Sequence, residues 1–167
     1  MRKLFAPLFI LLLLIQITYA QSNSDSTFSI GISGDSSDVV TKAQFGVVLA
    51  GGSTDVDEAM KWMMDRTGGG DFLIIRASGS TGYNDYLKEL GNVNSVETLL
   101  IDSREKAMSP LVGKRIREAE GLFIAGGDQW NYVRFWRREL SGSRWGRRFR
   151  LSTAVCDVPA TAATSSN

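Results

Sequence analysis

Between residues 45 and 136 the apolar positions follow two alternating patterns. Nearly continuous apolar runs, typical of strands covered on both faces of a sheet, occur at residues 45–50, 72–75, 96–101 and 122–125. Between these runs apolar residues recur at helical spacing. The pattern predicts helices over residues 56–64, 83–90 and 110–118, and another after Gly126-Gly127.

Helix boundaries are marked by residues with known terminal preferences. Ser53 or Thr54 is placed to cap the first helix, and Gly68 and Gly91 are placed to end the first and second. Pro110 suits a first helical turn, because its missing N–H would have no partner there.

Strands separated by helices indicate parallel pairing with right-handed crossovers. The expected fold is therefore α/β, a three-layer sandwich with a mostly parallel sheet. Such sheets place their ligand-binding loops at the carboxyl ends of the strands. Three loops meet this rule, at residues 50–54, 76–82 and 126–129.

The two ends of the chain differ from this α/β segment. Residues 1–20 resemble a cleavable signal peptide, with Arg2 and Lys3 before an apolar run and small residues before Gln21. A transmembrane anchor is the rival interpretation, but the apolar run is shorter than the roughly 20 residues that cross a bilayer. We expect export, periplasmic or extracellular, and no stable membrane anchor. Residues 21–44 are expected to form a loose polar leader.

Composition narrows the possible chemistry. The chain has 167 residues, enough for one ordinary domain, and its net charge of +1 gives no reason to expect a nucleic-acid partner. It contains no histidine, which removes the usual general base and the commonest metal ligand. Its single cysteine, Cys156, cannot form an internal disulfide or a cysteine-based zinc site. No cofactor and no metal are expected.

Glycine pairs after two predicted strands are candidates for anion binding, because backbone N–H groups can approach a ligand closely there. Gly51-Gly52 lacks the third glycine of a dinucleotide site, and its alternative role is a tight turn. Asp128 is suited to capping a helix, whereas Gln129 can reach over a strand end toward a substrate backbone. The aromatic residues of that helix, Trp130, Tyr132, Phe135 and Trp136, are expected mainly to pack against the sheet.

Several strings between residues 47 and 136 resemble the cyanophycinase-like branch of the S51 serine peptidases. They are AMKWM at 59–63, GGGDF at 68–72, IRASG at 75–79, YNDY at 83–86, VNSVET at 93–98 and FIAGGDQ at 123–129. The resemblance implies a flavodoxin-like sheet, shared with class I glutamine amidotransferase domains. It implies hydrolysis of aspartyl or β-aspartyl peptide bonds, with a peptide substrate. It also implies a loop at Gly126, Gly127, Asp128 and Gln129 that lines the oxyanion side of the substrate pocket; Gly51, Gly52 and Ser78 are possible further cleft residues.

The resemblance ends near Arg137. The family's nucleophile lies in a Gly-x-Ser-Ala-Gly string, which is absent here, and no histidine is present to activate a serine. No catalytic residue is therefore assigned, and the domain is expected to be an incomplete, N-terminal half over residues 45–136.

Residues 137–167 form an arginine-rich and then low-complexity tail. We expect it to reflect a shifted reading frame, a mis-joined exon or an early gene-model end. The alternative is a natural basic tail that binds an acidic polymer or a membrane surface.

Three interpretations remain open from the sequence. The first is an exported S51-type hydrolase by descent that is inactive in this chain. The second is a non-catalytic α/β module that binds a small anion or an acidic peptide. The third is a half-sheet whose exposed edge and apolar face make the chain poorly soluble.

Overall fold

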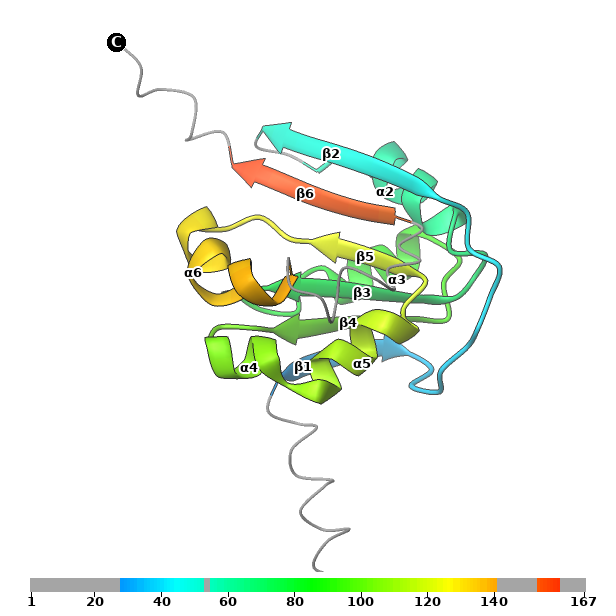
Figure 1. The fold of residues 1–167 in the computed structure, drawn as a ribbon. Coiled ribbons are helices and arrows are strands. Elements are labelled where there is room, and N and C mark those ends of the chain that lie inside the picture. Colours follow the sequence, from blue (N-terminus) through cyan, green and yellow to red (C-terminus); the bar gives the residue numbers. More distant parts are fainter. Residues whose placement is uncertain (1–27, 53–54, 141–152, 160–167) are drawn as a thin grey trace, which may run out of the picture.

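The structure is a computed structural model that describes residues 28–52, 55–140 and 153–159 (Figure 1). The strands are β1 (Ser29–Gly34), β2 (Gly46–Gly52), β3 (Asp71–Arg76), β4 (Ser95–Leu100), β5 (Gly121–Ile124) and β6 (Thr153–Pro159). The helices are α2 (Asp57–Asp65), α3 (Asn84–Leu90), α4 (Arg104–Met108), α5 (Pro110–Glu118) and α6 (Gln129–Leu140).

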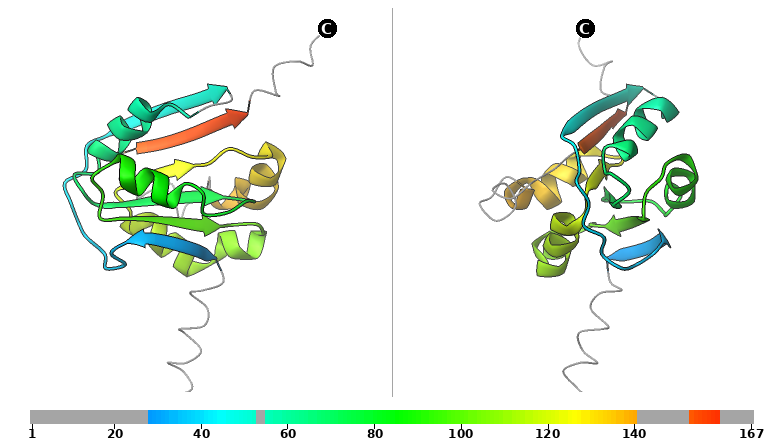
Figure 2. Two further views of the ribbon diagram at one scale, coloured as in Figure 1. Left: turned by 180° about the vertical axis from the view of Figure 1, so that it is seen from behind. Right: turned by 90° about the vertical axis from the view of Figure 1, so that its right-hand side faces the viewer.

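The strands form one six-stranded sheet in the order β1-β4-β3-β5-β6-β2. Strand β1 pairs antiparallel with β4, and every other pairing is parallel. Helices α2 and α3 cover one face of the sheet, and α4, α5 and α6 cover the other (Figure 2). The expectation of an α/β fold with a mostly parallel sheet between helical layers is confirmed.

The central strands are buried on both faces because their side chains alternate between two apolar clusters. In β3, Leu73 and Ile75 face the α4, α5 and α6 layer, whereas Phe72 and Ile74 face α2 and α3. All four side chains are at most 2% exposed. This double coverage explains why β3 and β5 are readable as continuous apolar runs.

The helix-terminal residues act largely as expected. Pro110 lies in the first turn of α5, Gly91 is the C-cap of α3, and Gly68 follows α2 with φ of 66°. Ser53 and Thr54 lie outside the described residues, and α2 begins at Asp57.

Two strands were not expected from the sequence. Residues 29–34, placed in a loose leader, form β1, and residues 153–159, placed in a low-complexity tail, form β6. An edge strand such as β1 is stabilised largely by backbone hydrogen bonds, so its sequence needs few apolar residues. The short helix α4 was also not expected.

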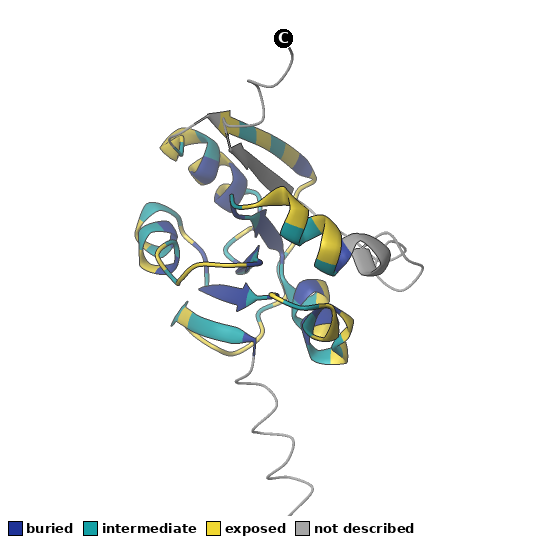
Figure 3. Cartoon of the chain, turned by 90° about the vertical axis from the view of Figure 1, so that its left-hand side faces the viewer, coloured by how far each residue is buried: buried dark blue, intermediate teal, exposed yellow. Residues whose placement is uncertain are grey.

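Strand β2 differs from the expectation of coverage on both faces. Val48 and Ala50 pack against the cluster under α2 and α3, but Val47 is 53% and Leu49 81% exposed on the opposite face. Figure 3 shows this alternation along the strand. The apolar run therefore identified the strand correctly and its burial wrongly, because no described helix covers that end of the second face.

A segment spanning residues 35–45 crosses the amino-terminal edge of the sheet and is held there by two carboxylates. Asp71 accepts hydrogen bonds from the Val39 backbone N–H at 3.0 Å, from Asn94 Nδ2 at 2.9 Å and from Ser95 Oγ at 2.6 Å. Glu120 accepts from the Asp71 backbone N–H at 2.8 Å. These contacts join the crossing segment to β3, β4 and β5.

A small cavity of about 30 Å³ lies at this same edge, lined partly by Asp38, Asp71 and Glu97. A volume of this size holds one or two water molecules and not a peptide.

No helix in the described part of the chain is long and apolar enough to span a membrane. The predicted signal peptide and most of the predicted tail lie outside that part.

Replacing Asp71 with alanine should lower the free energy of unfolding by about 2 kcal/mol, because three donors lose a charged acceptor. Urea denaturation measures the change. The matched control is Asp65→Ala, since Asp65 forms only an exposed pair with Lys61 at 3.5 Å. The control should change stability by less than about 0.5 kcal/mol; equal effects of the two variants would contradict this role for Asp71.

Burial, opposed by the backbone N–H donors of Asp71 and Thr41, raises the pKa of Glu120 above its ordinary value of 4.5. The folded state then holds the proton more tightly than the unfolded state, so stability is greatest below pH 4.5 for this group and falls as pH rises through the raised pKa. We expect the free energy of unfolding to decrease less with rising pH in Glu120→Gln than in the wild type. Urea denaturation across a pH series measures this difference. An unchanged pH profile would contradict this expectation.

Candidate functional site at the carboxyl ends of β3 and β5

Strands β3 and β5 are parallel neighbours. The connections that follow them run to opposite faces of the sheet. The connection after β3 leads to α3, which belongs to the layer with α2, whereas the connection after β5 leads to α6 on the other face. Two adjacent strands with diverging connections form a topological switch point, where α/β sheets open a crevice for ligands. Two of the strings that suggested the resemblance lie at this pair of strands. IRASG (75–79) spans the end of β3, and AGGDQ (125–129) follows β5.

The two loops contact each other directly. The backbone N–H of Ala125 donates to the Ile75 carbonyl at 3.1 Å, which continues the ladder past the end of β5. Two residues further on, a Cβ atom added at Gly127 would lie 3.9 Å from Ser78 Oγ. Ser78 and the Gly126–Gln129 loop were candidates from separate parts of the sequence. The structure places them close together.

The loop after β3 is folded around the side chain of Arg76. Its guanidinium donates from Nε to the Ser78 carbonyl at 2.5 Å and from Nη1 to the Ser80 carbonyl at 2.7 Å. Gly79 has φ of 102°, and a Cβ there would collide with the same guanidinium. Arg76 thus shapes the loop that presents Ser78 and contributes positive charge to this edge.

The loop after β5 is held by Tyr132 from α6. The Tyr132 hydroxyl lies 2.6 Å from the Ala125 carbonyl oxygen and 3.1 Å from that of Gly126, so it can donate to either. A Cβ at Gly127 would come within 2.9 Å of the same hydroxyl. A larger residue at this position would crowd the Tyr132 hydroxyl, whereas Ser78 lies at ordinary contact distance.

Asp128 caps α6, as the sequence allowed. Its Oδ1 accepts from the Trp130 backbone N–H at 2.9 Å, and its carbonyl accepts from Asn131. The backbone N–H groups of Gly127 and Asp128 donate to no acceptor among the described residues. With the N-terminus of the 12-residue helix α6 beside them, these N–H groups can bind an anion. Gln129 is exposed at the same place.

Gly51 and Gly52 do not join this site directly. They end β2, where they pair with Val158 and Pro159 of β6. Strand β6 lies between β2 and β5, so the third candidate loop is separated from the other two by one strand. No feature of the sequence of β2 indicated that a later strand would be inserted beside it.

The aromatic residues of α6 divide into packing and exposed groups. Trp136 is 3% exposed, its Nε1 donates to the Ile101 carbonyl at 2.8 Å, and its ring centroid lies 4.5 Å from that of Tyr132. Phe135 also packs against the core. Trp130 is 66% exposed, so the expectation of packing is wrong for this residue, whose side chain is open to solvent beside Gln129.

Two tyrosine–carboxylate pairs at the starts of α2 and α3 were missed by the sequence analysis. Tyr83 Oη donates to Asp55 at 2.9 Å, and Tyr86 Oη donates to Asp57 at 2.5 Å. Burial and the hydrogen bond to Asp57 raise the pKa of Tyr86, which keeps its hydroxyl protonated. Residues 28 positions apart in sequence carry no local signal of such a pair.

The chemistry available to Ser78 is limited. Its hydroxyl has no carboxylate or lysine partner among the described residues, and a serine without an adjacent base is a poor nucleophile. Nowhere in the described ranges do three histidine, cysteine, aspartate or glutamate residues gather in a way that could hold a metal ion. The arrangement supplies backbone N–H donors that could bind an anion.

No family model matches the chain, and no curated protein matches it.

The close approach of Gly127 to Tyr132 gives a testable coupling. Tyr132→Phe should cost about 1 kcal/mol of stability through lost hydrogen bonds to the loop carbonyls. Gly127→Ala should cost about 1–3 kcal/mol, because the new methyl group meets the Tyr132 hydroxyl. In the double variant that hydroxyl is absent, so the combined cost should be smaller than the two single costs added together. Strict additivity in urea denaturation would contradict the contact.

Proposed function

We propose that this chain carries the substrate-binding half of an exported, cyanophycinase-like S51 hydrolase. In this proposal it binds a carboxylate-bearing aspartyl or β-aspartyl peptide at the Gly126–Gln129 loop and does not cleave it. The observation that carries the proposal is the proximity of Ser78 to Gly127 beside the Ala125–Ile75 backbone hydrogen bond, at the switch point of the sheet. The FIAGGDQ and IRASG strings of the resemblance supply these two loops.

The roles follow from the positions of the groups. The N–H groups of Gly127 and Asp128 receive the ligand's carboxylate or carbonyl oxygen, since they have no described acceptor. Gln129 offers an amide to the peptide backbone, and Arg76 adds positive charge to the opposite side of the cleft. Donors pre-aimed at a forming oxyanion contribute about 3 kcal/mol to catalysis in a complete enzyme.

The same proposal includes a flavodoxin-like sheet of the class I glutamine amidotransferase type. Parallel pairing of β3, β4 and β5 and helices on both faces support it. The strand order departs from the flavodoxin order, in which the first strand of the parallel series is internal, because β2 lies at the sheet edge.

Turnover is not part of the proposal for this 167-residue chain. It contains no histidine and no Gly-x-Ser-Ala-Gly string, so nothing in it resembles the family's base or nucleophile. A second candidate, a module that binds a small anion without any hydrolytic ancestry, is favoured by the same unoccupied N–H donors. The two candidates differ in the ligand preferred.

Isothermal titration with a β-aspartyl dipeptide and with inorganic phosphate separates them. The proposal expects saturable binding of the dipeptide that is at least tenfold tighter than binding of phosphate, with no release of free amino acids. Preference for phosphate would favour the general anion module. If neither ligand binds, both candidates are contradicted. Hydrolysis of the dipeptide would contradict the non-catalytic role.

Gln129→Ala should weaken dipeptide binding about tenfold, the loss expected for one hydrogen bond to a buried peptide group. Gln44→Ala is the matched control, because Gln44 is also exposed but lies before β2, at the amino-terminal edge. An equal effect of both substitutions would place the ligand elsewhere.

A further inference from the structure

Strand β2 ends the sheet and has one unpaired edge. It is the last strand in the order, with β6 on its inner side and no described strand on its outer side. The segment from Phe45 to Gly52 contains no charged residue and no proline. Edge strands normally carry such residues to prevent pairing with another chain, and β2 has none of these protections.

The exposed side chains of β2 are large and apolar. Phe45 is 78%, Val47 53% and Leu49 81% exposed, and the three alternate along the strand, so they lie on one face of the sheet. Figure 3 shows the exposed positions interleaved with less exposed ones. A backbone edge ready for hydrogen bonding and an uncovered apolar row therefore coincide on the same strand.

The opposite edge of the sheet is different. Strand β1 has the sequence SIGISG, with serine and glycine at four of its six positions. It also lacks charged residues and proline, but Ile32, at 40%, is its single exposed large apolar side chain, and Ser33 Oγ donates to Asp85 of α3 at 2.5 Å. The exposed apolar row is therefore confined to the β2 edge, which favours a closed pair of subunits over an open chain of them.

We propose that β2 pairs antiparallel with β2 of a second copy of this chain, about a two-fold axis perpendicular to the sheet. This axis keeps the α4, α5 and α6 faces of the two copies on the same side. The two sheets then form one continuous sheet, and the apolar rows of both copies come together on one face.

The register follows from the side-chain directions. Directly opposed residues in an antiparallel pair share a face, so each exposed residue must oppose another on that face. An axis through Val48 places Val47 opposite Leu49 of the second copy, and Leu49 opposite its Val47. It also places Phe45 opposite Gly51, which leaves room for the ring. Apolar cross-strand pairs of this kind stabilise antiparallel sheets.

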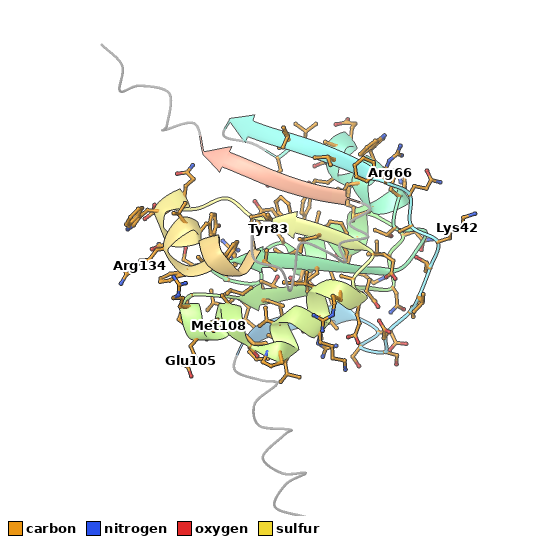
Figure 4. All side chains as sticks on the ribbon, in the orientation of Figure 1. Lys42, Arg66, Tyr83, Glu105, Met108 and Arg134 are labelled. Carbon is orange, nitrogen blue, oxygen red and sulfur yellow. The ribbon has the colours of Figure 1, made fainter. Side chains whose placement is uncertain are left out.

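Lys42 precedes β2, is exposed and projects outward (Figure 4). It lies outside the strand residues Gly46–Gly52. The proposed pairing therefore rests on the unpaired edge of β2 and on its exposed apolar row.

The oligomeric state tests the proposal. In sedimentation equilibrium the full chain should have the molar mass of a dimer. Val47→Lys should have the molar mass of a monomer, because dimerisation would bury a lysine on each of the two paired edges. Val133→Lys is the matched control, since Val133 is 44% exposed on α6 and is not on the sheet edge. Circular dichroism confirms that all three proteins are folded. A monomeric wild type, or a dimer that survives Val47→Lys, would overturn the proposal.

A crosslinking experiment tests the register separately. In a Cys156→Ser background, chains with Val47→Cys are mixed with chains with Leu49→Cys and oxidised. Opposed residues have Cα atoms about 4.5–5.5 Å apart, which a disulfide can bridge. We expect the mixture to yield covalent dimers at least fivefold more than either variant alone. Equal yields in the mixture and in the separate variants would overturn the register about Val48.

Discussion

The candidate site depends on the divergence of two neighbouring strands. Strand β3 continues to a helix on one face and β5 to a helix on the other, although the strands are paired from Phe72 to Ile75. Right-handed crossovers impose this geometry because β4, which follows β3, and β6, which follows β5, lie on opposite sides of the β3–β5 pair. The loops that leave the two strands therefore diverge, and Ser78 and Gly127 lie close together where they part.

Side chains from the flanking elements then fix the shape of that edge. Arg76 binds the carbonyls of its own loop, and Tyr132 binds the carbonyls before Gly127. The N–H groups of Gly127 and Asp128 donate to no acceptor among the described residues. The anchoring of α6 by Trp136 against Ile101 connects this arrangement to the buried core. The shape of this loop therefore depends on packing in the layer formed by α4, α5 and α6.

Many elements of the fold and most candidate site residues were predictable from local sequence pattern. The features that were not predictable depend on pairing between distant parts of the chain. Strands β3 and β5 and helix α5 have strong local signals, a doubly covered apolar run and a proline in the first turn. The candidate residues Ser78 and Gly126–Gln129 followed from their positions just after such strands. The insertion of β6 between β5 and β2, which separates Gly51 from the site, has no local signal. The exposure of Leu49 also depends on coverage by other elements, which a strand's own sequence does not encode.

The most direct test of the central claim is an amide-resolved NMR titration of the full chain with a β-aspartyl dipeptide. The account predicts that the largest chemical-shift changes fall on the N–H groups of Gly127 and Asp128, with smaller changes at Ser78. Shifts concentrated at Gly51 and the end of β2, or at the small cavity beside Asp71, would contradict it.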